Sequence, residues 1–301
     1  MNLLIIDKRD SWHVNDLNRA AGNQVAIVTA TYDELTATFD RQNQHPTEFT
    51  IAGQNLKAFD AVLTRAMPAS SLEQIVFRMD ALNQIEHQLN IPVINPAKTI
   101  ESSVDKYLSL ELMRQHDLSI PETHVSQNAH EAMTFFEDRG RTVLKPIFGS
   151  QGRGVCLLDN PDDAMKQFNR LQAEQNVIYQ QEFIEHGDSD IRVLVVGGQL
   201  FAMKRRNPGN WITNASQGGV CLPYQLTQSE RELAITAAHS QNALVAGVDI
   251  IYDQEQAIVV EINANPSWKN MAAAIDDDVS EAVLYLIGRM AGYELSRPSR
   301  A

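Results

Sequence analysis

Short apolar runs alternate with stretches of helical periodicity over residues 1–89. The apolar runs predict buried strands, and apolar residues three or four positions apart predict amphipathic helices. The predicted strands cover residues 3–6, 25–28 and 61–63, and the predicted helices cover residues 16–21 and 70–89. Strands that alternate with helices in this way indicate an α/β unit built on a parallel sheet.

A proline-marked extended segment, residues 90–96, separates this unit from the rest of the chain. Proline and the residue before it disfavour helix, so we place a domain boundary near residue 96. Residues 102–116 then have the spacing of one amphipathic helix.

From residue 142 the pattern is rich in strands, which indicates an α+β fold class for the remainder. Gly197 and Gly198 predict a tight hairpin turn, and residues 253–256 predict another. The predicted strands are 142–145, 155–158, 177–183, 191–196, 199–204, 248–252 and 257–262, and the predicted helices are 161–174, 229–244 and 279–292. We therefore expect three units, 1–95, 96–184 and 185–301.

Chain length, net charge and cysteine spacing argue against several classes of protein. The 301 residues allow two or three packed units, and no run is long enough to span a membrane, so a cytoplasmic protein without a membrane partner is expected. A net charge of -13 argues against sequence-independent binding of nucleic acid. The two cysteines, Cys156 and Cys221, lack the spacing of a disulfide framework or a zinc site.

A glycine-rich loop joins two predicted strands, with the sequence Gly149-Ser150-Gln151-Gly152-Arg153-Gly154. A dinucleotide-binding loop would open a helix, and a Walker A loop would end in Gly-Lys-Ser/Thr, so neither motif is present. The remaining interpretations are a hairpin whose backbone N–H groups approach phosphate, or an ordinary glycine turn.

Lys145 favours the phosphate interpretation, because it interrupts an apolar strand just before the loop. A lysine in such a strand needs an anionic partner, and phosphate is one that the loop can also bind. Lys106 alone is typical of a solvated helix lysine, and only its proximity to these features would make it a phosphate ligand.

Two acids interrupt apolar strands near the end of the chain. Asp249 and Glu261 lie on strands that a short turn would pair as a hairpin, and Asn263 shares a strand face with Glu261. Two carboxylates and an amide oxygen suit magnesium that carries ATP phosphates. The alternative is a pair of acids on the solvated face of a hairpin.

Basic residues concentrate in the same central region of the chain. Arg192 and Arg205 lie on adjoining predicted strands and could neutralise charge on a transferring phosphoryl group. They could equally pair with Glu185, Asp188 or Asp190, and this alternative stays open.

The order of these motifs resembles the RimK-like branch of the ATP-grasp superfamily, which includes α-L-glutamate ligases and LysX-type carboxylate–amine ligases. The resemblance covers essentially the whole chain and is carried by the following segments: 63–65, 105–106, 145–146, 149–154, 181–184, 190–193, 202–205, 218–219, 247–249 and 260–266. It implies an ATP-grasp fold behind an N-terminal parallel-sheet domain, with ATP and two Mg²⁺ ions, or Mn²⁺, as cofactors.

The resemblance also implies roles for individual residues. The nucleotide would contact Lys106, Lys145, Gly149, Ser150, Gln151, Gly152, Gly154, Glu182, Phe183, Ile184, Asp190 and Asn214, with Asp190 on the ribose side. Asp249, Glu261 and Asn263 would hold the metal ions. Arg192 and Arg205 would be the catalytic residues that steady an acyl phosphate, which an amine then attacks to give an amide, ADP and phosphate.

Two segments depart from the glutamate-ligase pattern. Ile212 stands where those relatives often have arginine, and residues 266–270 combine a glutamate-ligase Asn-Pro ending with a LysX-like aromatic-Lys-Asn. The expected partners are a small-molecule, peptide or protein-tail carboxylate and an amino-acid amine such as glutamate, and the family implies a homo-oligomer. An ATP-binding regulatory or scaffold protein and a kinase acting on a stable acceptor are the alternatives.

Overall fold

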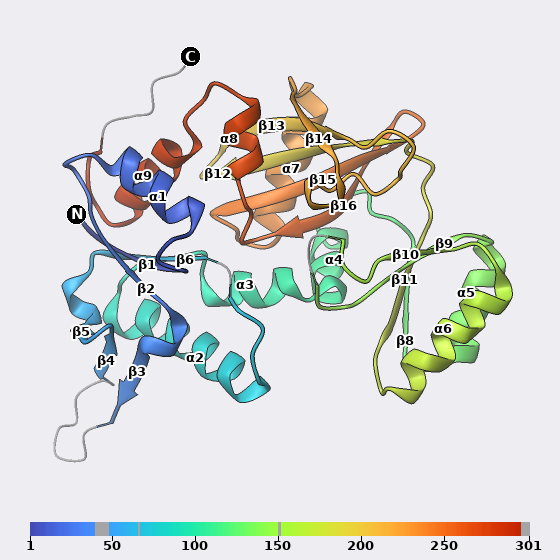
Figure 1. Ribbon diagram of the computed structural model, residues 1–301, viewed down its shortest axis with the longest axis horizontal. Helices are drawn as coiled ribbons and strands as arrows, with labels where there is room; N and C mark the ends of the chain where they lie inside the picture. The colour runs from blue at the N-terminus through green and yellow to red at the C-terminus, as the bar shows by residue number, and fades with distance from the viewer. Residues whose placement is uncertain (40–47, 66, 150–151, 296–301) are drawn as a thin grey trace.

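The structure is a computed structural model that describes residues 1–39, 48–65, 67–149 and 152–295 (Figure 1). The described elements form three larger sheets and one small one. Each of the larger sheets lies within one of the three predicted units, while the boundaries of those units stay predictions.

The N-terminal sheet is parallel, with the strand order β2-β1-β6-β7. Its alternating apolar residues divide between two cores: Leu3 and Ile5 pack toward α1, and Leu4 and Ile6 pack toward α2. The elements are β1 (Asn2–Ile6), α1 (Trp12–Ala21), β2 (Ala26–Ala30), β6 (Ala61–Thr64), α2 (Leu72–Leu89) and β7 (Val93–Ile94). The predicted α/β unit is therefore present.

A small antiparallel sheet that the sequence did not predict packs against this unit. Its strands are β3 (Leu35–Thr38), β4 (Glu48–Ile51) and β5 (Gln54–Asn55), and the 3-10 turns η1 (Tyr32–Glu34) and η2 (Leu56–Ala58) flank them. These strands are too short to show a clear period of two.

The helix predicted over residues 102–116 is wrong as a single element. The structure has α3 (Ala97–Val104) and α4 (Lys106–Arg114), separated at Asp105. The Asp105 side chain accepts hydrogen bonds from the backbone N–H groups of Tyr107 and Leu108, at 2.9 and 3.1 Å, and so caps α4. This break places Lys106 at the first position of a new helix.

The second large sheet, sheet C, is antiparallel with the strand order β10-β9-β11-β8. Two helices cover one of its faces with an apolar core that includes Phe136 and Phe168, which leaves the other face to the pocket described below (Figure 1). The elements are β8 (Thr123–Ser126), α5 (Ala129–Arg139), β9 (Thr142–Lys145), β10 (Cys156–Leu158), α6 (Pro161–Ala173) and β11 (Ile178–Glu182). The sequence predicted β9, β10, α6 and β11 but not β8 and α5.

The third large sheet, sheet D, is antiparallel with the strand order β14-β13-β12-β15-β16. One face packs on α4 and α7, so α4 belongs to the core of this sheet. The elements are β12 (Ser189–Val196), β13 (Gln199–Arg206), η3 (Ala215–Gln217), β14 (Val220–Pro223), α7 (Gln228–Ser240), β15 (Val245–Asp253), β16 (Gln256–Asn263), α8 (Lys269–Ala274) and α9 (Val279–Met290).

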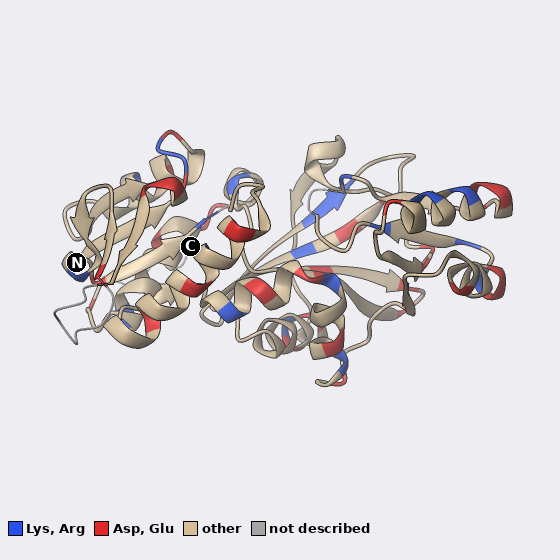
Figure 2. Cartoon of the chain, turned by 90° about the horizontal axis from the view of Figure 1, so that it is seen from below, with Lys and Arg blue, Asp and Glu red and all other residues tan. Residues whose placement is uncertain are grey.

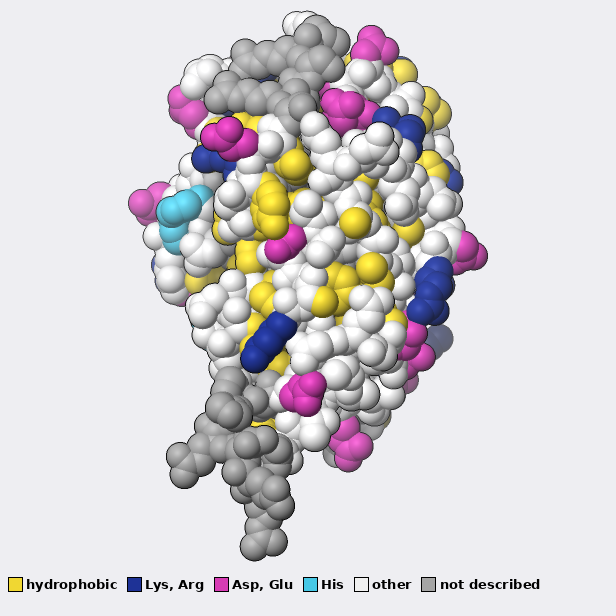
Figure 3. All heavy atoms as spheres, turned by 90° about the vertical axis from the view of Figure 1, so that its left-hand side faces the viewer, with side chains coloured by type: hydrophobic (Ala, Val, Ile, Leu, Met, Phe, Trp, Pro, Cys, Tyr) yellow, Lys and Arg dark blue, Asp and Glu magenta, His cyan; other side chains and the backbone are white. Residues whose placement is uncertain are grey.

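The opposite face of sheet D changes character along its strands. At one end Leu194, Val196 and Val245 join a core that also contains α9, Trp268 and residues of the N-terminal sheet. At the other end the strands carry charged residues side by side (Figure 2). On the far side of the molecule, the surface over the N-terminal unit instead shows small apolar groups among scattered charges (Figure 3).

Candidate active site

A pocket lies between the free face of sheet C and the charged end of sheet D. Most of the residues predicted to bind nucleotide line it, together with the loop that follows β13. The lining residues are Lys106, Pro121, Val143, Lys145, Pro146, Gly149, Gly152, Arg153, Val155, Gln181, Glu182, Phe183, Ile184, His186, Asp190, Arg205, Trp211, Ile212, Thr213, Asn214, Asp249, Ile251, Val260 and Glu261.

Strand register brings the predicted charged residues of sheet D onto one face. Asp190 pairs with Arg205, Arg192 pairs with Asp249, and Asp249 pairs with Glu261. Residues directly opposite each other in antiparallel strands share a face, and so do alternate residues of one strand. We call these five residues the polar face of sheet D.

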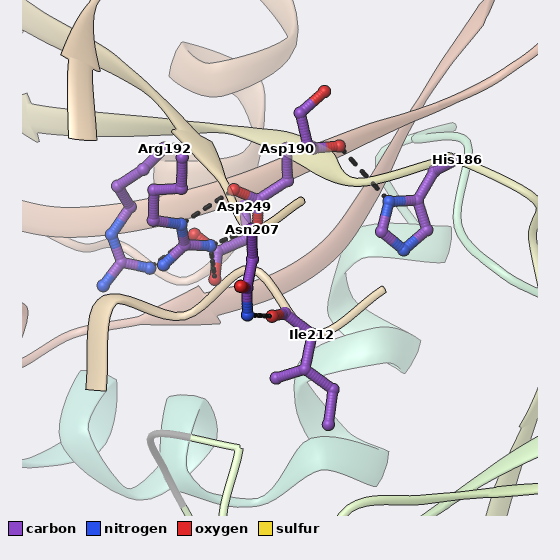
Figure 4. Close-up of polar contacts among 8 residues, drawn as sticks. His186, Asp190, Arg192, Asn207, Ile212 and Asp249 are labelled. Carbon is purple, nitrogen blue, oxygen red and sulfur yellow. Dashed lines mark hydrogen bonds and ion pairs between the residues drawn. The ribbon is translucent and has the colours of Figure 1, made fainter. Parts of the chain in front are cut away.

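Ion pairs connect the arginines of the polar face to its aspartates (Figure 4). Arg192 Nη1 lies 2.5 Å from Asp249 Oδ1, and Arg205 Nη2 lies 3.0 Å from Asp249 Oδ2. Arg205 Nε donates to Asp190 Oδ1 at 2.8 Å, and its Nη2 contacts Asp190 Oδ2 as well. Of the open alternatives, Arg205 therefore pairs with Asp190, while Asp188 and Glu185 pair with Arg206 and Arg141.

Burial makes these contacts strong. Asp190, Arg205 and Asp249 are 8%, 5% and 7% exposed. Burial alone would raise the pKa of Asp249, but the charges of Arg192 and Arg205 outweigh it and lower the pKa below its usual value. Burial likewise lowers the pKa of Arg205, and the charges of Asp249 and Asp190 reverse that effect.

Two backbone features shape the polar face. A bulge between Asp249 and Ile250 makes Val260 the extra residue of β16, and bulges of this kind re-aim neighbouring side chains. Gly247 leaves room for Arg192, because a Cβ there would lie 2.8 Å from Arg192 Cζ. The Arg192 guanidinium therefore lies directly over the β15 backbone.

The three residues predicted to bind a metal differ in the groups that their side-chain oxygens contact. Both Asp249 oxygens contact arginines, and Asn263 Oδ1 accepts the N–H of Asn265 at 2.8 Å. Glu261 lies on the pocket wall and makes no ion pair within the described ranges. The described residues contain no group of three His, Cys, Asp or Glu side chains suited to a metal. The oxygen donors fit Mg²⁺ chemically, with Glu261 as the available carboxylate.

Two lysines line the same pocket as the polar face: Lys145 on β9 of sheet C, and Lys106 at the start of α4. Lys145 Nζ donates to Gln181 Oε1, and Lys106 Nζ donates to the Gly149 carbonyl at 2.9 Å. The pKa of Lys145 is lowered to about 8, chiefly by burial; the charges of Glu261 and Asp249 oppose the shift, and the charge of Lys106 adds to it. Burial also lowers the pKa of Lys106. Neither lysine forms an ion pair in the part of the chain that the structure describes, so both need an anionic partner.

The glycine loop covers the pocket from one side. Gly152 and Gly154 have φ of +70° and +73°, which disfavours side chains. A Cβ on Gly152 would lie 3.1 Å from Asn214 Oδ1, so the loop touches the segment that follows β13. The predicted ligands Ser150 and Gln151 lie outside the described residues.

The predicted adenine hinge continues from the end of β11. The N–H groups of Glu182 and Phe183 donate to the carbonyls of Glu122 and Arg141, at 2.9 and 3.1 Å. In the described segments, the N–H of Ile184 has no such partner, which makes it the available donor of the hinge. The Arg141 guanidinium stacks on the Phe183 ring, with Cζ 4.3 Å from the ring centre. The centre of the Trp211 ring lies 5.6 Å from the centre of the Phe183 ring.

Gln181, which lines the pocket, and Asn207, which holds one of its loops, were not assigned roles from the sequence. Gln181 bonds to Lys145 and, through Nε2, to Thr123 and the Tyr179 hydroxyl, and so fixes the lysine. Asn207 Nδ2 donates to the Ile212 carbonyl at 2.7 Å and holds the loop that carries Trp211 (Figure 4). A glutamine inside an apolar strand was a usable signal for Gln181, whereas a loop asparagine gives none.

The chain is similar to known ligases in sequence. Residues 103–287 match the model of the RimK-like ATP-grasp domain. The chain is 30% identical over 216 residues to a tetrahydromethanopterin:alpha-L-glutamate ligase of Methanococcus maripaludis, covering 70% of this chain and 73% of that protein. It is 32% identical over 271 residues to a probable alpha-L-glutamate ligase of Syntrophotalea carbinolica, covering 88% and 87%.

Solved structures give the fold. The ATP-grasp ligase PsnB, complexed with minimal precursor, Mg and ADP, has a TM-score of 0.74 at 18% identity over 96% of this chain and 98% of that one. D-cycloserine synthetase DcsG has a TM-score of 0.71 at 16% identity over 96% and 100%. The predicted ATP-grasp fold with its N-terminal parallel sheet is thus confirmed. The chain belongs to the RimK-like ATP-grasp family of ligases.

Proposed function

We propose that this chain is an ADP-forming ligase that joins a carboxylate to an amine through an acyl phosphate. The proposal rests on one observation: cations without acid partners among the described residues and a face of paired charges line the same pocket. Lys145 on sheet C and Lys106 at the start of α4 have no anionic partner among the described residues, while the polar face of sheet D holds paired arginines and the acid Glu261. A polyphosphate in the pocket would give the two lysines an anionic partner and would also lie next to the arginines of the polar face.

The nucleotide would enter with its base toward the hinge. Apolar residues at that end, such as Val143, Val155 and Ile251, give the base an apolar slot, and the Ile184 N–H gives it one donor. The phosphates would then lie under the glycine loop, between Lys145 and Glu261. The predicted contact of Asp190 with the ribose, and that of Asn214 with the nucleotide, belong to this proposal.

The reaction has two steps. An oxygen of the substrate carboxylate attacks the γ-phosphorus of ATP. The bond from that phosphorus to the bridging oxygen breaks, which releases ADP and forms an acyl phosphate. The amine nitrogen then attacks the acyl carbon, the bond from that carbon to the phosphate oxygen breaks, and the nitrogen passes one proton to the departing phosphate. Among the described residues, only Nη1 of Arg192 has a hydrogen-bond acceptor, so its other N–H groups would hold the charged oxygens in both steps. Arg205, which is more enclosed, would fix the aspartates.

Magnesium would be held by Glu261 and Asn263, with Asp249 beside them, and would neutralise phosphate charge. Two ions are proposed, as in the sequence-based prediction. The amine is proposed to be an amino acid such as glutamate, which the names of the curated relatives support.

The test is ADP release from purified protein with ATP, Mg²⁺ and a panel of acids and amines. We expect release only when both an acid and an amine are present, and trapping by hydroxylamine as a hydroxamate. Glu261→Gln should lower kcat by at least about a hundredfold while the protein stays folded. Phosphate transfer to a stable acceptor without hydroxamate would identify a kinase instead, and nucleotide binding without turnover would identify a regulatory protein.

A further inference from the structure

Arg65 lies at the carboxyl end of β6 and reaches across to the segment that follows β16. Its Nη2 donates to the Pro266 carbonyl at 2.8 Å, and its Cζ lies 4.3 Å from the centre of the Trp268 ring. The side chain is 5% exposed. Arg65 therefore joins the N-terminal sheet to the same chain segment that extends the polar face of sheet D.

No acid among the described residues forms an ion pair with Arg65. The enclosed Nε atom of Arg65 also has no hydrogen-bond partner among them. The nearby Asp7 is occupied, because its oxygens accept from Lys8 N–H and from the Ser11 hydroxyl, at 2.8 and 2.7 Å. Burial consequently lowers the pKa of Arg65 to about 10, with only Asp7 opposing the shift.

Two other buried arginines show how unusual this is. Arg205 is also 5% exposed, and two aspartates neutralise it. Arg78 is 5% exposed and also has no acid partner in the part of the chain that the structure describes, but its Nη1 donates to the Ser70 hydroxyl at 2.7 Å. Only Arg65, among these three described arginines, has an enclosed N–H group without a partner. A buried guanidinium in this state is costly unless an anion completes it.

The surroundings of Arg65 favour an anion as well. Lys269, at the start of α8, is exposed. His13 stacks on Trp268 at 4.6 Å and accepts the Trp268 N–H at 3.3 Å, so it is held neutral. Burial, followed by the charge of Arg65, lowers the pKa of His13 to about 3, and Lys269 adds to the effect against the opposing charge of Asp16.

The position fits a substrate that reacts over the polar face. Along β16 the order is Glu261, then Asn263, and then Pro266, which Arg65 contacts. Three residues span at most about 11 Å, so Arg65 lies within the length of an amino acid or short peptide from Asn263. The carboxyl ends of parallel strands, where Arg65 lies, are also the edge at which such sheets bind ligands.

We propose that Arg65, with Lys269 beside it, forms a carboxylate-binding subsite for the substrate that reacts over the polar face of sheet D. This assignment rests on the proposed ligase function. The guanidinium of Arg65 would bind a carboxylate that is not consumed in the reaction, with its Nε–H group, which has no partner among the described residues, as one of the donors. The subsite would thus select substrates that carry a carboxylate away from the reacting group.

The test compares Arg65→Gln with wild type on L-glutamate and on two analogues that each lack one carboxylate, L-glutamine and L-isoglutamine. We expect the KM for L-glutamate to rise at least about tenfold, with the KM for ATP unchanged. For one of the two amides, wild type and variant should have equal KM, which identifies the carboxylate that Arg65 binds. If the acid and amine panel selects another amino acid, its own amide replaces these analogues.

Arg78→Gln is the matched control, because it removes an equally buried arginine that packs 5.2 Å from the Tyr32 ring in the same unit. It should leave all these KM values unchanged. Arg65→Lys keeps the charge without the planar fork and should give an intermediate KM, which covers the case in which Arg65→Gln does not fold. A change of equal size for L-glutamate and both amides, or no change at all, would overturn the subsite.

Failure of the ligase itself is recognised separately. If wild type releases no ADP with any acid–amine pair, the proposed function is wrong. The subsite is then tested by titrating L-glutamate into protein that contains Mg²⁺ and a non-hydrolysable ATP analogue. Binding that Arg65→Gln loses and Arg78→Gln keeps would support the subsite, and absence of binding to wild type would refute it.

Discussion

The two walls of the pocket balance their charges in opposite ways. On the polar face of sheet D, Arg205 and Arg192 are neutralised by Asp190 and Asp249 within the protein. On sheet C, the neutral Gln181 is the one hydrogen-bond partner of the Lys145 ammonium among the described residues, and burial lowers the pKa of this lysine. The charges of sheet D are therefore balanced by its own ion pairs, whereas sheet C needs an anion to balance Lys145. Substitutions on the two walls should therefore affect different quantities.

Asp249→Asn should have the largest effect, and mainly on stability. It removes a charge that contacts two enclosed arginines, and breaking a buried ion pair in this way costs about 3 kcal/mol or more. Chemical denaturation without nucleotide measures the change in the free energy of unfolding. Asp188→Asn, at the residue just before β12, is the matched control. Asp188 pairs with the exposed Arg206, so this substitution should cost less than about 1 kcal/mol. Equal losses in both variants would contradict the comparison.

Lys145→Met should affect ligand binding and leave the fold intact. It removes a desolvated cation that has no acid partner among the described residues, so the free energy of unfolding should stay the same or rise without nucleotide. The Kd for ATP should increase about tenfold or more, because a phosphate contact is lost. Titration calorimetry measures the Kd, and Lys166→Met, which changes an exposed lysine of α6, should leave it unchanged. A destabilised Lys145→Met with normal ATP binding would refute the role of this wall.

The pH dependence of stability should distinguish the walls more finely. The pKa of Lys145 is lowered to about 8 in the folded chain, below the value of about 10.4 for an exposed lysine. Between these values the unfolded chain binds the extra proton, so the contribution of Lys145 to stability rises with pH from about 8 to about 10.4. The difference in unfolding free energy between wild type and Lys145→Met isolates it. Bound ATP should abolish this rise, and a difference that falls over that range would contradict the assignment.

The sequence predicted the components of the site better than their pairing. Lys145, Asp249 and Glu261 were recognisable because each interrupts an apolar strand, and the structure places all three in one pocket. The partner of Arg205 stayed open, since strand register selects it and the sequence offered several acids nearby. The bulge at Val260 was also invisible, because a single extra residue leaves the apolar pattern intact.

Contacts between distant segments were beyond the sequence altogether. Arg65 and Pro266 are 201 positions apart, and only the packing of the N-terminal sheet against α9 and Trp268 brings them together. The break at Asp105 was missed for a local reason, since an aspartate within an amphipathic pattern can continue a helix or cap a new one.

Gly152→Ala should give the smallest effect, and it tests whether the glycine loop binds the nucleotide together with Lys145. Alanine at φ +70° costs about 1 kcal/mol of backbone strain, and its Cβ would lie 3.1 Å from Asn214 Oδ1. Gly140→Ala has the same strain at φ +72° but meets nothing within 4 Å, so it separates the strain from the contact. We expect similar small losses of stability in both variants, with a severalfold rise in the KM for ATP in Gly152→Ala alone. An equal KM in the two variants would mean that the loop closes over the pocket without taking part in binding the nucleotide.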